Sequence, residues 1–232
     1  MRAALTYSAW LVGIPLELLI IAALVRGAFR RFPVILIYSV VLFLTTVVDI
    51  SVYRAYYSGS KLGHSFAHYY WIDEGLRQVL VFAVVISLIY EATATARARF
   101  TLRASLVCGA ILFAGISFLM HYDSHAVVGR WMTLWSRDLD FSTAILDLAL
   151  WAMLLAWRHK DIQLLMLSGG LGIEFTGEAI GQSLRSLVPV TVLPGDALML
   201  SANLVGMYIW WQALRTIPVE HVRELKPRAR VS

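Results

Sequence analysis

The chain has 232 residues, of which 59% are hydrophobic and 15% are charged. Soluble domains carry about 25% charged residues, so this composition excludes an ordinary soluble domain and indicates a membrane protein. The formal net charge is +5. We attribute this charge to basic residues that flank membrane helices and attract anionic lipid headgroups, and we expect no binding of nucleic acid.

Seven apolar segments approach the roughly 20 residues that a helix needs to cross the hydrocarbon of a bilayer. In chain order they comprise residues 8–26, 34–54, 69–91, 104–121, 138–157, 162–184 and 195–214. Apolar runs of this length do not fit a β-barrel, whose strands alternate in polarity over about ten residues. We therefore predict an all-α integral membrane protein, a seven-transmembrane-helix bundle formed by residues 1–214.

Lys and Arg residues are concentrated on one side of the predicted helices. The connections after the first, third and fifth segments and the C-terminal tail carry Arg26, Arg30, Arg31, Arg97, Arg99, Arg103, Arg158, Lys160, Arg215, Arg223, Lys226, Arg228 and Arg230. The opposite side carries Arg2, Arg54, Lys61, Arg130, Arg137 and Arg185. Because cytoplasmic loops hold the excess of basic residues, the N-terminus is predicted outside and the short basic tail, residues 215–232, in the cytoplasm. We expect the protein to be integral to a cell or inner membrane.

Acidic side chains lie inside these apolar segments or at their outer edges. They are Glu17, Asp49, Asp73, Glu74, Asp140, Asp147, Glu174 and Glu178. A carboxylate at the centre of a bilayer costs roughly 2.5–3.5 kcal/mol even on the mildest insertion scale, so such groups usually face a bundle interior or a wet cavity. The predicted topology places Glu17, Asp147 and Glu174 nearest the middle of the bilayer and the other acids in its outer half.

Helical spacing on the sixth segment places acids and glycines together. Gly170, Glu174, Gly177 and Gly181 recur at intervals of four, three and four residues, so they share one helix face, with Glu178 beside it. Glycines on a membrane helix allow a neighbouring backbone to approach closely. We therefore predict that this face contacts another helix and that both glutamates point into the bundle.

Acids on other segments follow a similar logic. Asp140 and Asp147, seven residues apart, share a face of the fifth segment, and Asp49 lies near the outer end of the second. Asp73 and Arg77 are four residues apart on the third segment, a spacing that permits an intrahelical ion pair. The alternative to a role of this pair in binding is a purely structural one, in which the two charges neutralise each other so that they can enter the membrane.

These side chains form the predicted binding site, an acidic cavity that faces outward. The site residues are Asp49, Asp73, Glu74, Arg77, Asp140, Asp147, Glu174 and Glu178. Their excess negative charge is relieved by protonation, by hydrogen bonds from other helices, or by a bound cation. Our main hypothesis is that the cavity binds or moves a cation, proton or small cationic ligand, with transport and sensing both open. The alternative is a set of structural acids, protonated or solvated by water.

A second group of polar residues is predicted outside the membrane. His64 and His68 are predicted in the loop between the second and third segments, and His121, Asp123 and His125 follow the fourth. These residue types suit zinc or a similar metal, although solvated histidines at an interface are the alternative. The corresponding alternative function is a metal-dependent membrane hydrolase at the outer leaflet, with an acid such as Asp73 or Glu74 as general base.

Other functions are disfavoured by residues that the chain lacks. A covalent retinal requires a lysine within the bundle, whereas Lys61, Lys160 and Lys226 all lie outside the predicted spans. No phosphate-binding loop, dinucleotide fingerprint or nucleophile elbow is present in the sequence. We therefore expect no cofactor and consider an enzyme the less favoured class. A third hypothesis is a structural subunit of a larger membrane complex, with another membrane protein as partner.

Overall fold

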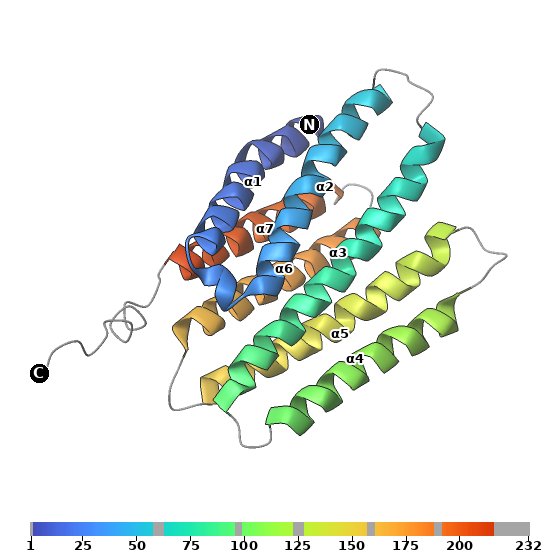
Figure 1. Cartoon of the computed structure of the whole chain (residues 1–232). Helices are drawn as coiled ribbons and strands as arrows, with labels where there is room; N and C mark the ends of the chain where they lie inside the picture. Colours follow the sequence, from blue (N-terminus) through green and yellow to red (C-terminus); the bar gives the residue numbers. More distant parts are fainter. Residues whose placement is uncertain are drawn as a thin grey trace, which may run out of the picture.

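The computed structural model describes residues 2–57, 63–95, 99–122, 128–156, 161–187 and 192–215. Within these residues the chain is all-helical and has no strand. The α-helices are α1 (Arg2–Val25), α2 (Pro33–Tyr57), α3 (Gly63–Ala92), α4 (Arg99–His121), α5 (Val128–Ala156), α6 (Ile162–Leu187) and α7 (Val192–Arg215) (Figure 1). Short 3-10 turns, η1 (Ala28–Arg30) and η2 (Thr93–Thr95), follow α1 and α3. Each predicted segment thus corresponds to one helix, and the all-helical prediction is confirmed for the described residues.

Four helical segments among the described residues are long and apolar enough to cross a membrane. They are Pro33–Ser51, Gly75–Ala92, Trp135–Ala156 and Val192–Arg215. Shorter apolar stretches occur at Trp10–Val25 and Val107–His121. Helix α6 is more polar, because Glu174, Glu178 and Arg185 fall within it. The length and composition of the four segments indicate association with a membrane.

Several helices extend beyond the apolar segments that predicted them. Helix α3 begins at Gly63, so His64 and His68 belong to its first turns and not to a loop, which corrects the sequence-based expectation. Helix α5 likewise begins at Val128, ten residues before its apolar segment. Hydropathy marks only the part of a helix that suits hydrocarbon, whereas backbone hydrogen bonding continues through polar turns at either end.

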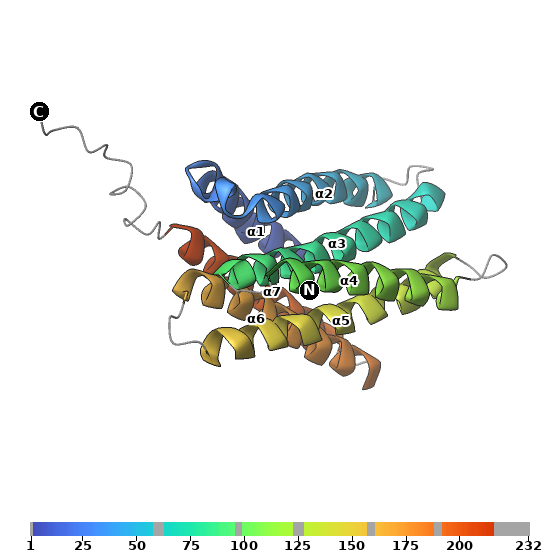
Figure 2. The same ribbon diagram turned by 60° about the horizontal axis from the view of Figure 1, so that its bottom comes forward.

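Six helices form a closed ring of neighbours in which α1, α2, α3, α5, α6 and α7 each pack against the next, and α7 returns to α1. Helix α4 lies outside this ring and packs mainly on α5; it lies at the lower edge of the bundle in Figure 1 and crosses in front of other helices in Figure 2. Its exposed side chains include Ile111, Leu112, Leu119 and Met120. The ring therefore has an interior to which side chains from six helices have access.

The distribution of polarity is partly inverted relative to a soluble protein. Large apolar side chains are exposed on the outer faces, while the interior buries Glu17, Ser39, Gln78, Asp147 and Ser168. An apolar core fills one half of the ring; its fully buried members include Leu24, Phe32, Ile35, Leu88, Leu167, Leu171 and Leu214. An exposed apolar surface around a partly polar interior suits hydrocarbon as the surrounding solvent.

Helices α6 and α7 form the most extensive pair in the bundle. A Cβ atom added at Gly170 would lie 2.7 Å from Cδ1 of Trp210, and one added at Gly177 would collide with the Cβ of Ala202. On the other helix, a Cβ at Gly206 would lie 2.9 Å from the carbonyl oxygen of Gly170. The backbones can approach this closely only because these positions lack side chains. The predicted glycine contact face of the sixth segment is therefore confirmed.

Candidate functional site

A cavity of about 230 Å³ lies in the half of the ring opposite the apolar core. Its walls come from residues 10–17 of α1, 42–49 of α2, 174–178 of α6 and 199–207 of α7, together with Arg77 of α3. The titratable groups that line it are Glu17, Asp49, Arg77, Glu174 and Glu178. We call this space the acidic cavity. Its other walls are mainly apolar and include Trp10, Leu42, Met199, Leu200, Leu204 and Met207.

Glu17 is the least exposed of these acids, with a relative exposure of 4%. The hydroxyl group of Thr46 on α2 donates a hydrogen bond to its Oε1 atom at 3.1 Å. Its Oε2 atom is buried and has no hydrogen-bond partner among the described residues. Buried carboxylate oxygens are nearly always satisfied, so this oxygen has spare capacity to accept a hydrogen bond.

Glu174 faces the same space from α6. The side-chain amide of Asn203 on α7 donates a hydrogen bond to its Oε1 atom at 2.9 Å. Glu178, one helical turn further along α6, accepts a longer hydrogen bond of 3.3 Å from Gln182. The glycine contacts described above set the position of Glu174, because they hold α6 against α7 on either side of it.

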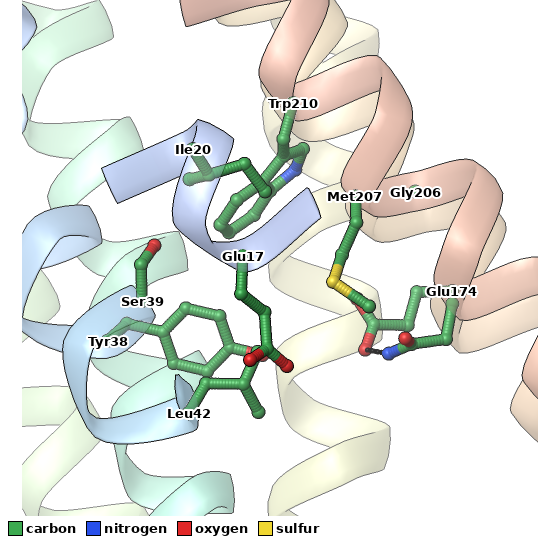
Figure 3. Close-up of a pocket in the computed structure, with 10 residues that line it drawn as sticks. Glu17, Ile20, Tyr38, Ser39, Leu42, Glu174, Gly206, Met207 and Trp210 are labelled. Carbon is green, nitrogen blue, oxygen red and sulfur yellow. Dashed lines mark hydrogen bonds between the residues drawn. The ribbon is translucent and has the colours of Figure 1, made fainter. Parts of the chain in front are cut away.

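A smaller space, the inner hollow, continues from the acidic cavity towards the apolar core. It has a volume of about 10 Å³, close to what one water molecule requires. Figure 3 shows the carboxylate of Glu17 between Tyr38 and Leu42 on one side and Met207 on the other, with Trp210 beyond Ile20. Glu17, Leu42, Glu174, Asn203 and Met207 line both spaces. The two acids thus lie where the cavity narrows.

The predicted site residues are only partly brought together. Asp49, Arg77, Glu174 and Glu178 line the acidic cavity. Asp73 lies nearby, where it and Arg77 line a small space beside Tyr38 and Thr45. The backbone of Glu74 belongs to α3, but its side chain lies outside the described residues.

The two predicted acids of α5 do not line the acidic cavity. Asp147 is 3% exposed and lies between α5 and α6, where the hydroxyl group of Ser168 donates a hydrogen bond to its Oδ1 atom at 2.7 Å. Asp140, two turns earlier on α5, is half-buried. Helix α5 packs mainly on α3 and α6, and Asp147 contacts Ser168 of α6, which explains its separation from the cavity.

The predicted metal ligands are not assembled among the described residues, which contain no group of three or more His, Cys, Asp or Glu residues able to hold a metal ion. The Nδ1 atom of His121 lies 2.9 Å from the carbonyl oxygen of Ser117 and 3.7 Å from Oδ2 of Asp138. Asp123, His125 and the side chains of His64 and His68 lie outside the described residues. The metal site therefore stays a prediction.

A cluster of polar side chains lies at the opposite end of the bundle. Arg31 follows η1 and donates hydrogen bonds to Glu91 of α3 at 2.7 Å, to Gln163 of α6 at 2.9 Å and to Asp161 at 2.5 Å. The Gln163 side chain in turn donates to the carbonyl oxygen of Ala213 on α7. We call Arg31, Glu91, Asp161 and Gln163 the Arg31 cluster.

The charge of Arg31 is well supported in this cluster. Partial burial lowers the pKa of Arg31, but hydrogen bonds to Asp161 and Glu91, together with their negative charges, outweigh that effect and raise the pKa above its usual range. Asp161 also accepts hydrogen bonds from the backbone amides of Gln163 and Leu164 at the start of α6. The cluster therefore joins the α1–α2 connection to three other helices.

Sequence reasoning identified the intramembrane acids but missed two features of this arrangement. Glu17 is not among the predicted site residues, yet it lines the cavity together with Gly13, one turn earlier on the same helix face. That spacing was the available signal. From the sequence, Arg31 is only an orientation signal, because nothing local in the sequence relates it to Glu91 or Asp161.

Comparison with protein-family models, with curated proteins and with solved structures gives no match. Functional inference for this chain therefore depends on the geometry of its own residues.

Proposed function

We propose that the chain is a seven-span integral membrane protein whose acidic cavity binds or moves a cation, proton or small cationic ligand. The observation that carries the proposal is the lining of the cavity: the carboxyl groups of Glu17, Asp49, Glu174 and Glu178 face it, against the single guanidinium of Arg77 among the described lining residues. Polar cavities of this kind within helix bundles are common positions for ligand and ion sites.

The depth of the acids supports binding over mere solvation. Glu17 is buried to the same degree as ordinary core side chains, and it lies beside apolar groups such as Leu42 and Met207. An ionised group in that setting is stabilised by an opposite charge, and a neutral one requires a proton. Either way, the cavity holds positive charge, as a cation or as a proton.

The topology belongs to the same proposal. The acidic cavity lies at the end of the bundle where α1 and α7 begin, and the Arg31 cluster lies at the end where both helices terminate. With the N-terminus outside, the cavity faces outward and the Arg31 cluster lies near the cytoplasm. The cavity and the cluster would then occupy opposite sides of one membrane.

Cysteine labelling tests the orientation. In a Cys108→Ser background, Lys61→Cys and Ser232→Cys each introduce a single thiol on opposite sides of the predicted topology. A membrane-impermeant maleimide applied to intact cells should label the first variant only, and both should be labelled after permeabilisation. Labelling of Ser232→Cys in intact cells would contradict an outward-facing cavity.

Thermal stability of the purified protein tests cation binding. Sodium, potassium, calcium and ethylammonium salts should be compared at equal ionic strength, because a ligand that binds only the folded state raises the melting temperature in a saturable manner. We expect at least one cation to stabilise the native protein and to lose this effect in the Glu174→Gln, Glu178→Gln double variant.

Asp147→Asn is the matched control for this experiment. Asp147 is as buried as Glu17 and accepts a similar hydroxyl hydrogen bond, but it does not line the cavity. The control variant should therefore respond to cations like the native protein. Identical melting curves in every salt, for the native protein and the double variant alike, would mean that the acids have a structural role only.

A further inference from the structure

We infer that the ligand of the acidic cavity is a small organic ammonium ion with an apolar body, and that Glu17 is its inner anchor. This inference rests on the proposed function and specifies its ligand class. An acidic lining alone would not identify a ligand. The second observation is the Oε2 atom of Glu17, which is buried at the narrow end of the cavity without a hydrogen-bond partner among the described residues.

The geometry at Glu17 suits an N–H donor. Thr46 occupies the Oε1 atom, so Oε2 is the oxygen left to accept a hydrogen bond from a ligand. A protonated amine carries two or three N–H groups and one positive charge, and it can donate to Glu17 and Glu174 at the point where the two side chains approach the inner hollow. The hollow itself has room for about one water molecule, so the ligand body must extend towards the larger space.

The cavity walls favour an organic cation over a metal ion. Calcium and magnesium require six or more oxygen ligands close together, yet no metal-binding group of acids occurs among the described residues. Between the carboxylates the cavity presents Trp10, Leu204 and Met207. Contact between these side chains and the hydrocarbon part of a ligand is favourable because it removes apolar surface from water, and the face of a tryptophan ring also attracts ammonium groups.

The size of the cavity limits the ligand. A volume of about 230 Å³ is below the 300–1,000 Å³ typical of sites for drug-sized molecules. It accommodates a molecule of roughly eight non-hydrogen atoms, given that a bulk water occupies about 30 Å³. The remaining acids, Asp49 and Glu178, lie towards the wide part, where they give the ligand an attractive path of entry.

A matched pair of probes separates charge from shape. 2-Phenylethylamine carries a primary ammonium group on an apolar body of suitable size, and 2-phenylethanol has the same body without the charge. Binding to the full-length protein in detergent should be measured by calorimetry and by thermal shift, with sodium and calcium chloride as an inorganic arm. We expect the amine to bind saturably and the alcohol to bind at least tenfold more weakly.

Two variants test the anchor. Glu17→Gln should weaken binding of the amine at least about tenfold, because it removes a charged hydrogen-bond acceptor. Trp10→Leu should weaken it several-fold without altering a charge, which keeps the inference testable if Glu17→Gln does not fold. Asp147→Asn, equally buried but outside the cavity, should bind the amine like the native protein.

Each outcome has a distinct meaning. Stabilisation by sodium or calcium but not by the amine would overturn the ligand class and leave the proposed function standing. No binding of any of these cations would overturn the ligand class and would also overturn the proposed function for every cation except the proton. Equal affinity of the amine for the native protein, Glu17→Gln and Trp10→Leu would show that it binds elsewhere and would overturn the assignment of the anchor.

Discussion

Replacing Arg31 by alanine removes the side chain that connects four parts of the bundle. Its guanidinium donates to Glu91, Gln163 and Asp161, and Gln163 continues the connection to the carbonyl oxygen of Ala213. The planar guanidinium can serve several acceptors at once, which the point charge of a lysine cannot do in the same way. We therefore expect Arg31→Lys to restore only part of the stability that Arg31→Ala loses.

The expected loss of stability in Arg31→Ala follows from how exposed Arg31 and its partners are. The side chains of Arg31 and Asp161 are each 33% exposed and that of Glu91 is 31% exposed. Fully exposed ion pairs contribute about 0.2–1 kcal/mol, and hydrogen bonds to charged groups in buried settings about 1.5–3 kcal/mol. Taking about 1 kcal/mol for each ion pair and somewhat less for the amide contact, Arg31→Ala should cost about 2–3 kcal/mol. For a chain of this size, that is a decrease in melting temperature of roughly 5–10 °C.

Thermal melts in detergent measure this effect, with Arg30→Ala as the control. Arg30 is the adjacent residue, is exposed, and contributes the same single positive charge to the α1–α2 connection. Arg30→Ala should therefore change the melting temperature by less than about 2 °C. A general effect of charge on lipid or detergent contacts would appear in both variants.

A double-mutant cycle identifies the pair responsible. Glu91→Gln should destabilise the native protein by about 1 kcal/mol and should cost almost nothing in the Arg31→Ala background, because its partner is already absent. The reasoning would be refuted if Arg31→Ala and Arg30→Ala melted at the same temperature, or if the effects of Arg31→Ala and Glu91→Gln were simply additive.

Two further predictions concern contacts in the interior. Gly177→Ala should cost about 1–3 kcal/mol of stability in thermal melts, because its Cβ atom would collide with Ala202. Adding Ala202→Gly should recover part of this loss. Gly115→Ala, which has open space at its Cβ position, should be neutral in the same melts. Ser168→Ala should cost about 1–3 kcal/mol of stability in a thermal melt, because it removes the hydroxyl group that donates to the buried carboxylate of Asp147. Asp147→Asn should destabilise the protein less, since an amide tolerates burial better than a charge. A Ser168→Ala variant as stable as the native protein would mean that another group satisfies Asp147.

The sequence by itself determined the helices and the polarity of the interior. Apolar runs of membrane-spanning length are a local property, so hydropathy located each α-helix of the described residues, although it missed polar turns such as those containing His64 and His68. The spacing of Gly170, Gly177 and Gly181 also predicted a contact face, because periodicity within one helix depends only on that helix.

Only the tertiary structure decided which acids share a cavity. Periodicity gives the face of a helix on which a residue lies, but not the rotation of that helix relative to its neighbours or the depth at which their side chains meet. Glu17 and Asp147 are both carboxylic acids and are similarly buried, yet one lines the acidic cavity and the other accepts a hydrogen bond from Ser168 between α5 and α6. Arg31 likewise meets Glu91 and Asp161 only because the bundle brings together the ends of helices that lie far apart in the chain.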